Sequence, residues 1–435
     1  MSNSLNDEKE EEKLINNEPL INEENKDASK SRIFIYYSLT VGVMLLVVII
    51  VFLIAVNFGG KISSTQNNSL NNSFISKYII SEENSKIKLF SSELINNISS
   101  MKIDDKEINI TNEYIFENKG IHKVEVFLKR ELNSMEKLFK ECSNLTEIDL
   151  SQLITINITT IAEMFYDCYK LTSIDLSNLN VSKIVNMSNL FNGCFNLELI
   201  NLTNLETSNV KDMNFMFYSC INLKSLDLTS FNTSKVKNMT GIFYRCNSLR
   251  FLNISNFDTS EVLSMKMMFD SCISLTNLSL NNFDTSKVTD MSYMFASMQK
   301  LKSIDLSSFN TTKVKKMNNM FYGCYSLNIT NFNSFNTSNL IDMGYMFYNC
   351  KSMFSLDLRV FNTDKVENMG GAFGGCKKLK FLDIRKFTTK GLIYKNNLFP
   401  NINNEMGTIY YNYIDFERTL LDNIYHWNHV SVIND

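Results

Sequence analysis

Histidine and proline are scarce in this chain, and its charges nearly cancel. The three histidines, His122, His426 and His429, leave few candidates for a histidine metal site or a Ser/His/Asp triad. With 43 Lys and Arg against 46 Asp and Glu, the net charge of −3 excludes the strongly basic field of a dedicated nucleic-acid binder. Only Pro19 and Pro400 interrupt backbone hydrogen bonding, so the chain between them can form a continuous ladder. We therefore expect a non-catalytic protein with no metal, no cofactor and no nucleic-acid partner.

Residues 33–56 form a long apolar segment without a single charge. As a helix, its 24 residues would extend about 36 Å, which exceeds the roughly 30 Å hydrocarbon core of a bilayer. A cleavable secretory signal would begin nearer the N-terminus and have a shorter apolar region. The segment is therefore predicted to be a transmembrane signal-anchor helix.

Charges and glycosylation motifs around this segment predict its orientation. Lys26, Lys30 and Arg32 lie just before it, whereas the first base after it is Lys61, and the more basic flank stays in the cytoplasm. All sixteen N-x-S/T sequons follow the segment, as expected for a glycoprotein whose C-terminal part enters the secretory lumen. We expect a single-pass type II membrane protein with the C-terminal part outside the cell; an endolysosomal membrane is the alternative.

Residues 1–32 hold nine acidic and five basic residues, a composition that predicts a disordered cytoplasmic tail. Within it, Glu10, Leu14 and Ile15 match an acidic dileucine sorting signal, in which an acid stands four residues before a Leu-Leu or Leu-Ile pair. The alternative is an ordinary solvated tail, because so short a pattern also arises by chance.

The cysteines show that most of the remaining chain is a repeat. All nine lie on one 26-residue lattice, whose vacant point is Met298: Cys142, Cys168, Cys194, Cys220, Cys246, Cys272, Cys324, Cys350 and Cys376. Three residues before each of the ten lattice points stands a phenylalanine: Phe139, Phe165, Phe191, Phe217, Phe243, Phe269, Phe295, Phe321, Phe347 and Phe373. Because no insertion or deletion interrupts the lattice, each repeat is predicted to be one structural unit.

One clear unit runs over residues 231–256, and its apolar pattern changes period midway. Over residues 236–246 the apolar residues recur at steps of three and four, which predicts a short helix. Over residues 249–254 they alternate, which predicts a short strand. Because one helix and one strand cannot bury their apolar faces alone, the units should stack into a right-handed α/β solenoid with a parallel sheet on one side.

The repeat motif S-x-F-[ND]-T-S-x-V-x-x-M-x-x-M-F-x-x-C-x-x-L-x-x-L-D-L resembles the BspA-like leucine-rich repeat of mycoplasma lipoproteins and protist surface proteins. The resemblance covers about ten units, over residues 131–390. Members of that family are mostly cell-surface proteins of adhesion and host contact. The resemblance therefore implies an adhesion or recognition module for an extracellular protein or glycan; a sorting or signalling receptor that uses the Glu10 motif is the alternative.

The usual leucine-rich repeat has a buried Asn where this sequence has Phe257 and its equivalents. Another group must then satisfy the backbone at the turns. The Thr-Ser pairs, such as Thr233 and Ser234, are predicted to do so by capping the N-terminus of each helix.

The segments that flank the repeats are predicted from their composition. Residues 57–85 are expected to be a polar linker, and residues 86–130 contain β-prone runs that would form an N-terminal cap over the first strand. Gly391 and Pro400 break the pattern, so residues 391–435 are expected to form an aromatic C-terminal cap. A ligand site is the alternative for its aromatic residues: Tyr410, Tyr411, Tyr413, Phe416, Tyr425 and Trp427.

The cysteine column admits three interpretations. On a helical side, neighbouring units would be about 8–10 Å apart, beyond the roughly 7 Å limit between the Cα atoms of a disulfide. Met298 in the vacant slot indicates that the position takes an apolar filler. Buried structural thiols are therefore the favoured interpretation. Some disulfides or a metal are the alternatives, and the metal is disfavoured because no C-x-x-C pair is present.

One residue of each strand, between its two apolar positions, should face solvent on the concave surface. Six units carry a carboxylate there, which makes a candidate ligand-contact stripe: Asp149, Asp175, Asp227, Asp305, Asp357 and Asp383. One alternative is a strand face that is merely solvated. Another is calcium between neighbouring carboxylates, at Asp149 with Asp175 or Asp357 with Asp383.

Overall fold

The computed structural model describes residues 72–394, 398–402, 406–412, 414, 416, 420–421 and 424–431. The chain divides into two compact units, Met1–Ser69 and Leu70–Asp435, and the described residues all belong to the second. The predicted cytoplasmic tail with its sorting motif and the predicted anchor at 33–56 therefore lie outside the described residues. Among the residues that are described, no helix is long and apolar enough to cross a bilayer.

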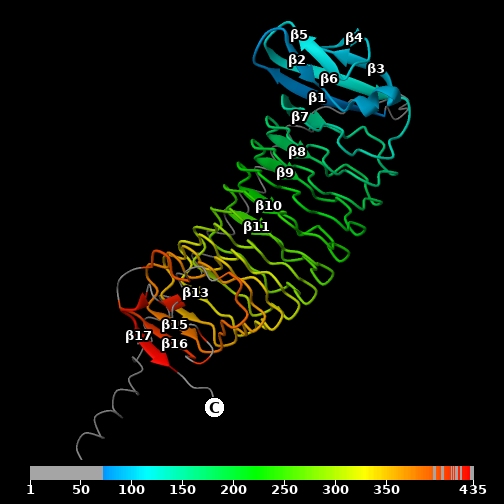
Figure 1. The fold of residues 1–435 in the computed structure, drawn as a ribbon. Helices are drawn as coiled ribbons and strands as arrows, with labels where there is room; N and C mark the ends of the chain where they lie inside the picture. The colour runs from blue at the N-terminus through cyan, green and yellow to red at the C-terminus, as the bar shows by residue number, and fades with distance from the viewer. Residues whose placement is uncertain are drawn as a thin grey trace, which may run out of the picture. The chain divides into compact units, whose positions relative to one another are not determined.

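An antiparallel five-stranded sheet leads into the repeats (Figure 1). Its order is β4-β3-β6-β1-β7, and its strands are β1 (Ser73–Ile80), β3 (Ile98–Ile103), β4 (Lys106–Ile108), β6 (Gly120–Leu128) and β7 (Leu145–Asp149). Beside it lie a ribbon of two strands and a 3-10 helix: β2 (Ser85–Lys88), β5 (Glu113–Phe116) and η2 (Ser92–Asn97).

β1 covers the edge of β7, the first strand of the repeats. The two strands pair antiparallel, with Ser76 opposite Ile148. The predicted linker 57–85 is wrong for residues 73–80, because β1 occupies them and buries Phe74 and Tyr78. From Phe74 onward, buried and less buried residues alternate along β1, which is the pattern of a strand packed on one face. β1 thus pairs an edge that would otherwise be open to other chains.

The repeats form a β solenoid in which most units contribute one short strand. Within residues 173–384, neighbouring strands that pair are parallel and join residues 26 apart, such as Leu226 and Leu252. The strands that follow β7 are β8 (Ser173–Asp175), β9 (Leu199–Asn201), β10 (Ser225–Asp227), β11 (Phe251–Asn253), β12 (Ser303–Ile304), β13 (Ile329–Thr330), β14 (Ser355–Asp357), β15 (Phe381–Ile384), β16 (Thr408–Tyr411) and β17 (Asn428–Ser431).

A second set of contacts joins the units along what we call the turn face, residues 238–246 and their equivalents in the other units. Within the described residues, nine single-residue parallel bridges run along this face, each between residues 26 apart. The phenylalanine column stacks in the same units, with ring centroids 5.3–6.0 Å apart. Neighbouring turns of the solenoid are therefore bonded without a break along the turn face, whereas the strands pair in separate sheets of two or four.

The predicted helix of each unit is wrong, because the turn face consists of successive turns. A helix bonds each N–H to the carbonyl four residues earlier. Here Gly241 N donates to Lys266 O of the next unit at 2.8 Å, and Phe243 N donates to Met268 O at 3.1 Å. Gly241 and Arg245 have φ of 59° and 61°, in the left-handed region that a right-handed helix cannot contain. The fold is thus a β solenoid and not an α/β solenoid.

Spacing explains why no helix fits. Packed α-helices lie about 8–10 Å apart, whereas the rings of Phe217 and Phe243 in successive units are 6.0 Å apart. A ladder of turns can match that spacing because its N–H groups point to the next unit. The apolar steps of three and four residues then arise from consecutive turns that share one buried side.

The repeat continues beyond its predicted end at residue 390. Phe399, at the next lattice point, stacks on Phe373 with ring centroids 5.3 Å apart. Gly375 N donates to Pro400 O at 2.8 Å, so Pro400 accepts a bond between units where it was expected to break the pattern. β16 and β17 then extend the parallel sheet of β14 and β15.

A column of buried threonines replaces the missing Asn ladder. Thr285 Oγ1 donates to Asn310 O at 2.9 Å and accepts from Asn310 N at 2.8 Å, which satisfies both backbone groups of one residue in the next unit. The same donation recurs from Thr207, Thr233, Thr259, Thr311, Thr337 and Thr363. The predicted helix-capping role is therefore wrong; these hydroxyls join neighbouring units instead.

Replacing Thr285 with Val should destabilise the solenoid strongly, because the shape is kept while both partners on Asn310 lose their bond. An unsatisfied buried backbone group costs about 1–3 kcal/mol, so the expected loss is about 2–4 kcal/mol. Thr285→Ser keeps the hydroxyl and removes one methyl group, worth about 1 kcal/mol. Urea denaturation should therefore give a lower midpoint for the Val variant than for the Ser variant. Equal midpoints would show that the hydroxyl does not join the units.

Candidate ligand-binding face

The six carboxylates of the predicted stripe lie at the C-terminal ends of their strands or within one residue of those ends. We keep the name Asp stripe for Asp149, Asp175, Asp227, Asp305, Asp357 and Asp383. The first five are exposed and Asp383 is half-buried, so the stripe faces solvent along most of its length.

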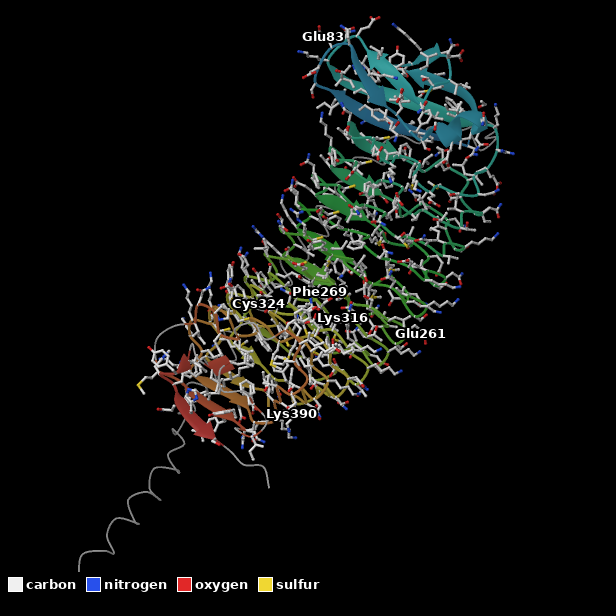
Figure 2. The ribbon with its side chains drawn as sticks, viewed as in Figure 1. Glu83, Glu261, Phe269, Lys316, Cys324 and Lys390 are labelled. Carbon is white, nitrogen blue, oxygen red and sulfur yellow. The ribbon has the colours of Figure 1, made fainter. Side chains whose placement is uncertain are left out.

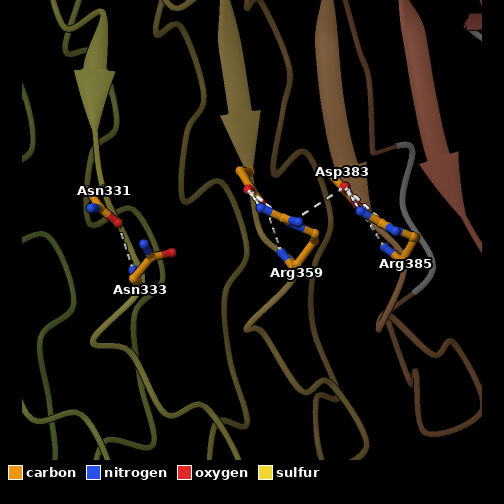
Figure 3. Close-up of polar contacts among 6 residues, drawn as sticks. Asn331, Asn333, Arg359, Asp383 and Arg385 are labelled. Carbon is orange, nitrogen blue, oxygen red and sulfur yellow. Dashed lines mark hydrogen bonds and ion pairs between the residues drawn. The ribbon is translucent and has the colours of Figure 1, made fainter.

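Each member of the Asp stripe also holds the turn that follows its strand. Ser177 N donates to Asp175 Oδ1 at 2.8 Å, and the same bond to the residue two positions on recurs along the stripe. This bond from Ser307 N lowers the pKa of Asp305. Where a unit has Asn instead, the amide oxygen accepts in the same way, as Asn331 does from Asn333 N at 2.9 Å (Figure 3). The sequence signal for this role is an Asp or Asn that ends a strand and begins a turn.

Two arginines that the sequence analysis missed neutralise the C-terminal end of the stripe. Arg359 Nη2 lies 2.6 Å from Asp357 Oδ2, and Arg385 Nη2 lies 2.7 Å from Asp383 Oδ2 (Figure 3). Arg359 Nε also lies 3.8 Å from Asp383 Oδ2, so the four side chains form one row. The Arg359 hydrogen bond lowers the pKa of Asp357. One proposed calcium pair, Asp357 with Asp383, is thus bridged by a guanidinium.

Exposed apolar side chains accompany the polar stripe on the strand face. Leu199 is 58% exposed, Phe251 42%, Phe354 48% and Phe381 45%. The rings of Phe354 and Phe381 contact each other, with centroids 5.6 Å apart. Other units carry Ser at the position of Phe251 and Phe381, and that departure from the repeat was the available sequence signal.

The nine cysteines are all fully buried and unpaired with one another. Most donate Sγ–H to a phenylalanine carbonyl of the preceding unit, as Cys168 does to Phe139 O at 3.1 Å. Burial raises the pKa of the Cys246 thiol to about 12. Cys324 and Phe269 both lie inside the stack of side chains (Figure 2), and Met298 fills the vacant slot with no exposed surface.

The geometric reason given against disulfides is wrong, although the thiols are buried. The units were expected to lie 8–10 Å apart on the side of the cysteines, but the turn face carries direct backbone bonds between units. Neighbouring Cα atoms at strand-like spacing of about 4.8 Å fall within the disulfide range of about 4.4–6.8 Å. Burial and the Sγ–H bonds, rather than distance, favour free thiols.

The C-terminal aromatic residues are divided between the interior and the surface. Tyr411, Phe416 and Trp427 are buried, and Tyr425 is largely exposed. Tyr410 lies below the Arg385 guanidinium, 5.9 Å from its carbon to the ring centroid. Of the predicted set, Tyr413 lies outside the described residues, as do Glu10, Leu14 and Ile15 of the sorting motif. Within the described part of the chain, no group of three His, Cys, Asp or Glu could hold a metal ion.

One family model matches the chain repeatedly along the solenoid. It is described as a Mycoplasma protein of unknown function, DUF285, and it matches residues 68–173, 133–251, 243–355 and 328–409, well over half of the sequence. The chain belongs to this family. None of the curated proteins matches it.

Two solved structures are similar over part of their length. A leucine-rich repeat protein from Bacteroides ovatus is 16% identical and covers 66% of this chain and 88% of its own, with a TM-score of 0.20. The TLR13 chain of a TLR13–ssRNA13 complex is 14% identical and covers 65% of this chain and 53% of its own, with a TM-score of 0.19. TM-scores this low carry no argument about function.

The thiols should alkylate slowly in the native protein, because the reactive thiolate is disfavoured by burial. After denaturation without reductant, mass spectrometry should count nine modified cysteines, and a shortfall of two or more would mean a disulfide. Met298→Cys should add a tenth slow thiol. Ser255→Cys, at an exposed strand-face position, should react fast and serves as the control.

Proposed function

We propose that the solenoid is a non-catalytic recognition module that binds an extended extracellular protein or glycan along its strand face. The observation that carries this proposal is the in-register array of exposed side chains on that face, polar in the Asp stripe and apolar at Phe251, Phe354 and Phe381. Successive strands lie about 4.8 Å apart, so ten rows extend on the order of 45 Å. That length suits an extended ligand.

Many weak contacts, rather than one pocket, would provide the affinity. A solvated carboxylate contributes at most about 1 kcal/mol to an ion pair. Several contacts in register, or several copies on one surface, raise the effective concentration of the next contact. Adhesion, which the BspA-like motif implies, depends on this kind of multivalent binding.

We further propose that residues 33–56 anchor the module as a single-pass type II protein, with residues 1–32 in the cytoplasm. The uncharged segment and the sixteen sequons that follow it support this arrangement at the cell surface, with an endolysosomal membrane as the alternative. The Glu10, Leu14 and Ile15 motif favours a second candidate function, a sorting or signalling receptor. Unchanged surface abundance after replacing residues 8–15 would count against that second function.

Neutralising the Asp stripe should weaken ligand binding without unfolding the solenoid. In the triple variant Asp175→Asn, Asp227→Asn and Asp305→Asn, the amide oxygen can keep the turn bond, as Asn331 does. Cells that display this variant of the full chain should attach less strongly to arrays of matrix proteins and glycans, because three exposed charges are lost. Their loss should also reduce the salt dependence of attachment.

The matched control removes three charges from the turn face. Asp212, Asp290 and Asp342 lie at its bridge positions, where other units have Asn. Changing these three to Asn should leave attachment unchanged. Equal attachment by both triple variants would contradict a role for the Asp stripe.

Protease added to the intact cells tests the proposed orientation. It should abolish attachment while a tag at Asn3 survives; the reverse protection pattern would contradict the proposed orientation.

A further inference from the structure

Exposed aromatic and arginine side chains meet near the C-terminal end of the strand face. Phe354 directly precedes β14 and Phe381 is the first residue of β15, and Arg359 and Arg385 follow the ends of the same strands. We call these four residues the Phe-Arg patch. Tyr410 on β16 borders it beneath Arg385.

The two phenylalanines of the patch are exposed where most other units have polar residues. Both are about half exposed, and their rings contact each other at 5.6 Å. At the position of Phe381, the units of β8, β10 and β12 have Ser173, Ser225 and Ser303. Paired exposed aromatic rings of this kind are typical anchors of protein interfaces.

The two arginines are held in fixed positions before any ligand arrives. Each uses Nε and Nη2 to hold the Asp two residues earlier. Nη1 makes no hydrogen bond to the described residues, and the Arg359 side chain is 56% exposed. A guanidinium fixed in this way loses little conformational freedom when it binds a carboxylate.

Charge in this region favours an acidic ligand. Residues 351–390 contain nine Lys and Arg against four Asp and Glu, a net charge of +5 in a chain whose total is −3. Two of the four acids, Asp357 and Asp383, already form ion pairs with the patch arginines. Lys377, Lys378 and Lys386 are exposed, form no ion pair with the described residues and add positive charge within the same two units.

We propose that the Phe-Arg patch binds an acidic polypeptide segment that also carries apolar side chains. Its carboxylates meet the arginines and lysines, and its apolar side chains cover the two phenylalanines. A sulfated or other purely polar polyanion would leave those rings exposed, which favours a polypeptide. The inference rests on the proposed recognition function and assigns one partner chemistry to one part of the strand face.

The test is a selection of displayed random peptides of about twelve residues on the full chain purified in detergent. Extended at about 3.3 Å per residue, such peptides can cross the patch. We expect the selected peptides to be enriched in Asp and Glu and in apolar residues. The double variant Phe354→Thr and Phe381→Ser should bind them about tenfold or more weakly, as expected for loss of interface anchors.

Control variants place residues that other units already carry at the same repeat positions. Tyr345→Asn removes an exposed aromatic ring from the turn face, where the preceding unit has Asn319, and should leave binding unchanged. Arg359→Ser with Arg385→Ser should weaken binding and lower its salt dependence, and circular dichroism verifies each fold. No enrichment, enrichment of basic peptides, or equal binding by the Phe354 and Phe381 double variant would overturn the proposal. If that happened while the Asp stripe variant still lost attachment, the recognition function would stand without this partner.

Discussion

The backbone hydrogen bonds between units on the turn face determine the rest of this structure. If neighbouring units were joined only through strands on one side, the stack of units could curve and carry wider elements, such as helices, on the other side. Bonds such as Gly241 N to Lys266 O require the second side to follow at the same close spacing. The phenylalanine rings, the threonine hydroxyls and the thiols then stack in columns because each unit repeats the same position.

This register also explains why surface chemistry extends in rows. A residue type that recurs every 26 positions recurs along one line on the surface, so weak contacts are multiplied along the sheet. The same register permits local departures, since a Ser position can take Phe381 and a Ser or Thr position can take Arg385 without disturbing the buried columns. The uniform interior therefore supports a variable exterior, which is what a recognition surface needs.

The sequence predicted those features that depend on the lattice. The stacked units, the short strands, the buried cysteines and the exposed position of most of the Asp stripe all follow from a period of 26 and from alternation. The prediction of a helix in each unit was wrong because apolar residues at steps of three and four fit either a helix or a series of turns. The left-handed positions were hidden because Arg245, Phe215 and Tyr293 occupy some of them, where glycine would have indicated a turn. Each of the two arginines pairs with the Asp two residues earlier in its own unit, and the sequence shows both residues but not that their side chains meet. The contact of Arg359 with Asp383 joins two units, which no single repeat displays.

The most direct test of the turn face is the sign of one glycine substitution. Ser297 has φ of 56°, and the equivalent residue of the next unit is Gly323. Left-handed backbone costs a non-glycine residue about 1–2 kcal/mol, partly offset by the greater freedom of glycine in the unfolded chain. Ser297→Gly should therefore raise the urea midpoint, while Ala296→Gly, outside the left-handed positions, should lower it. In a helix both substitutions would destabilise, glycine by about 1 kcal/mol relative to alanine, so a lower midpoint for Ser297→Gly would contradict the account.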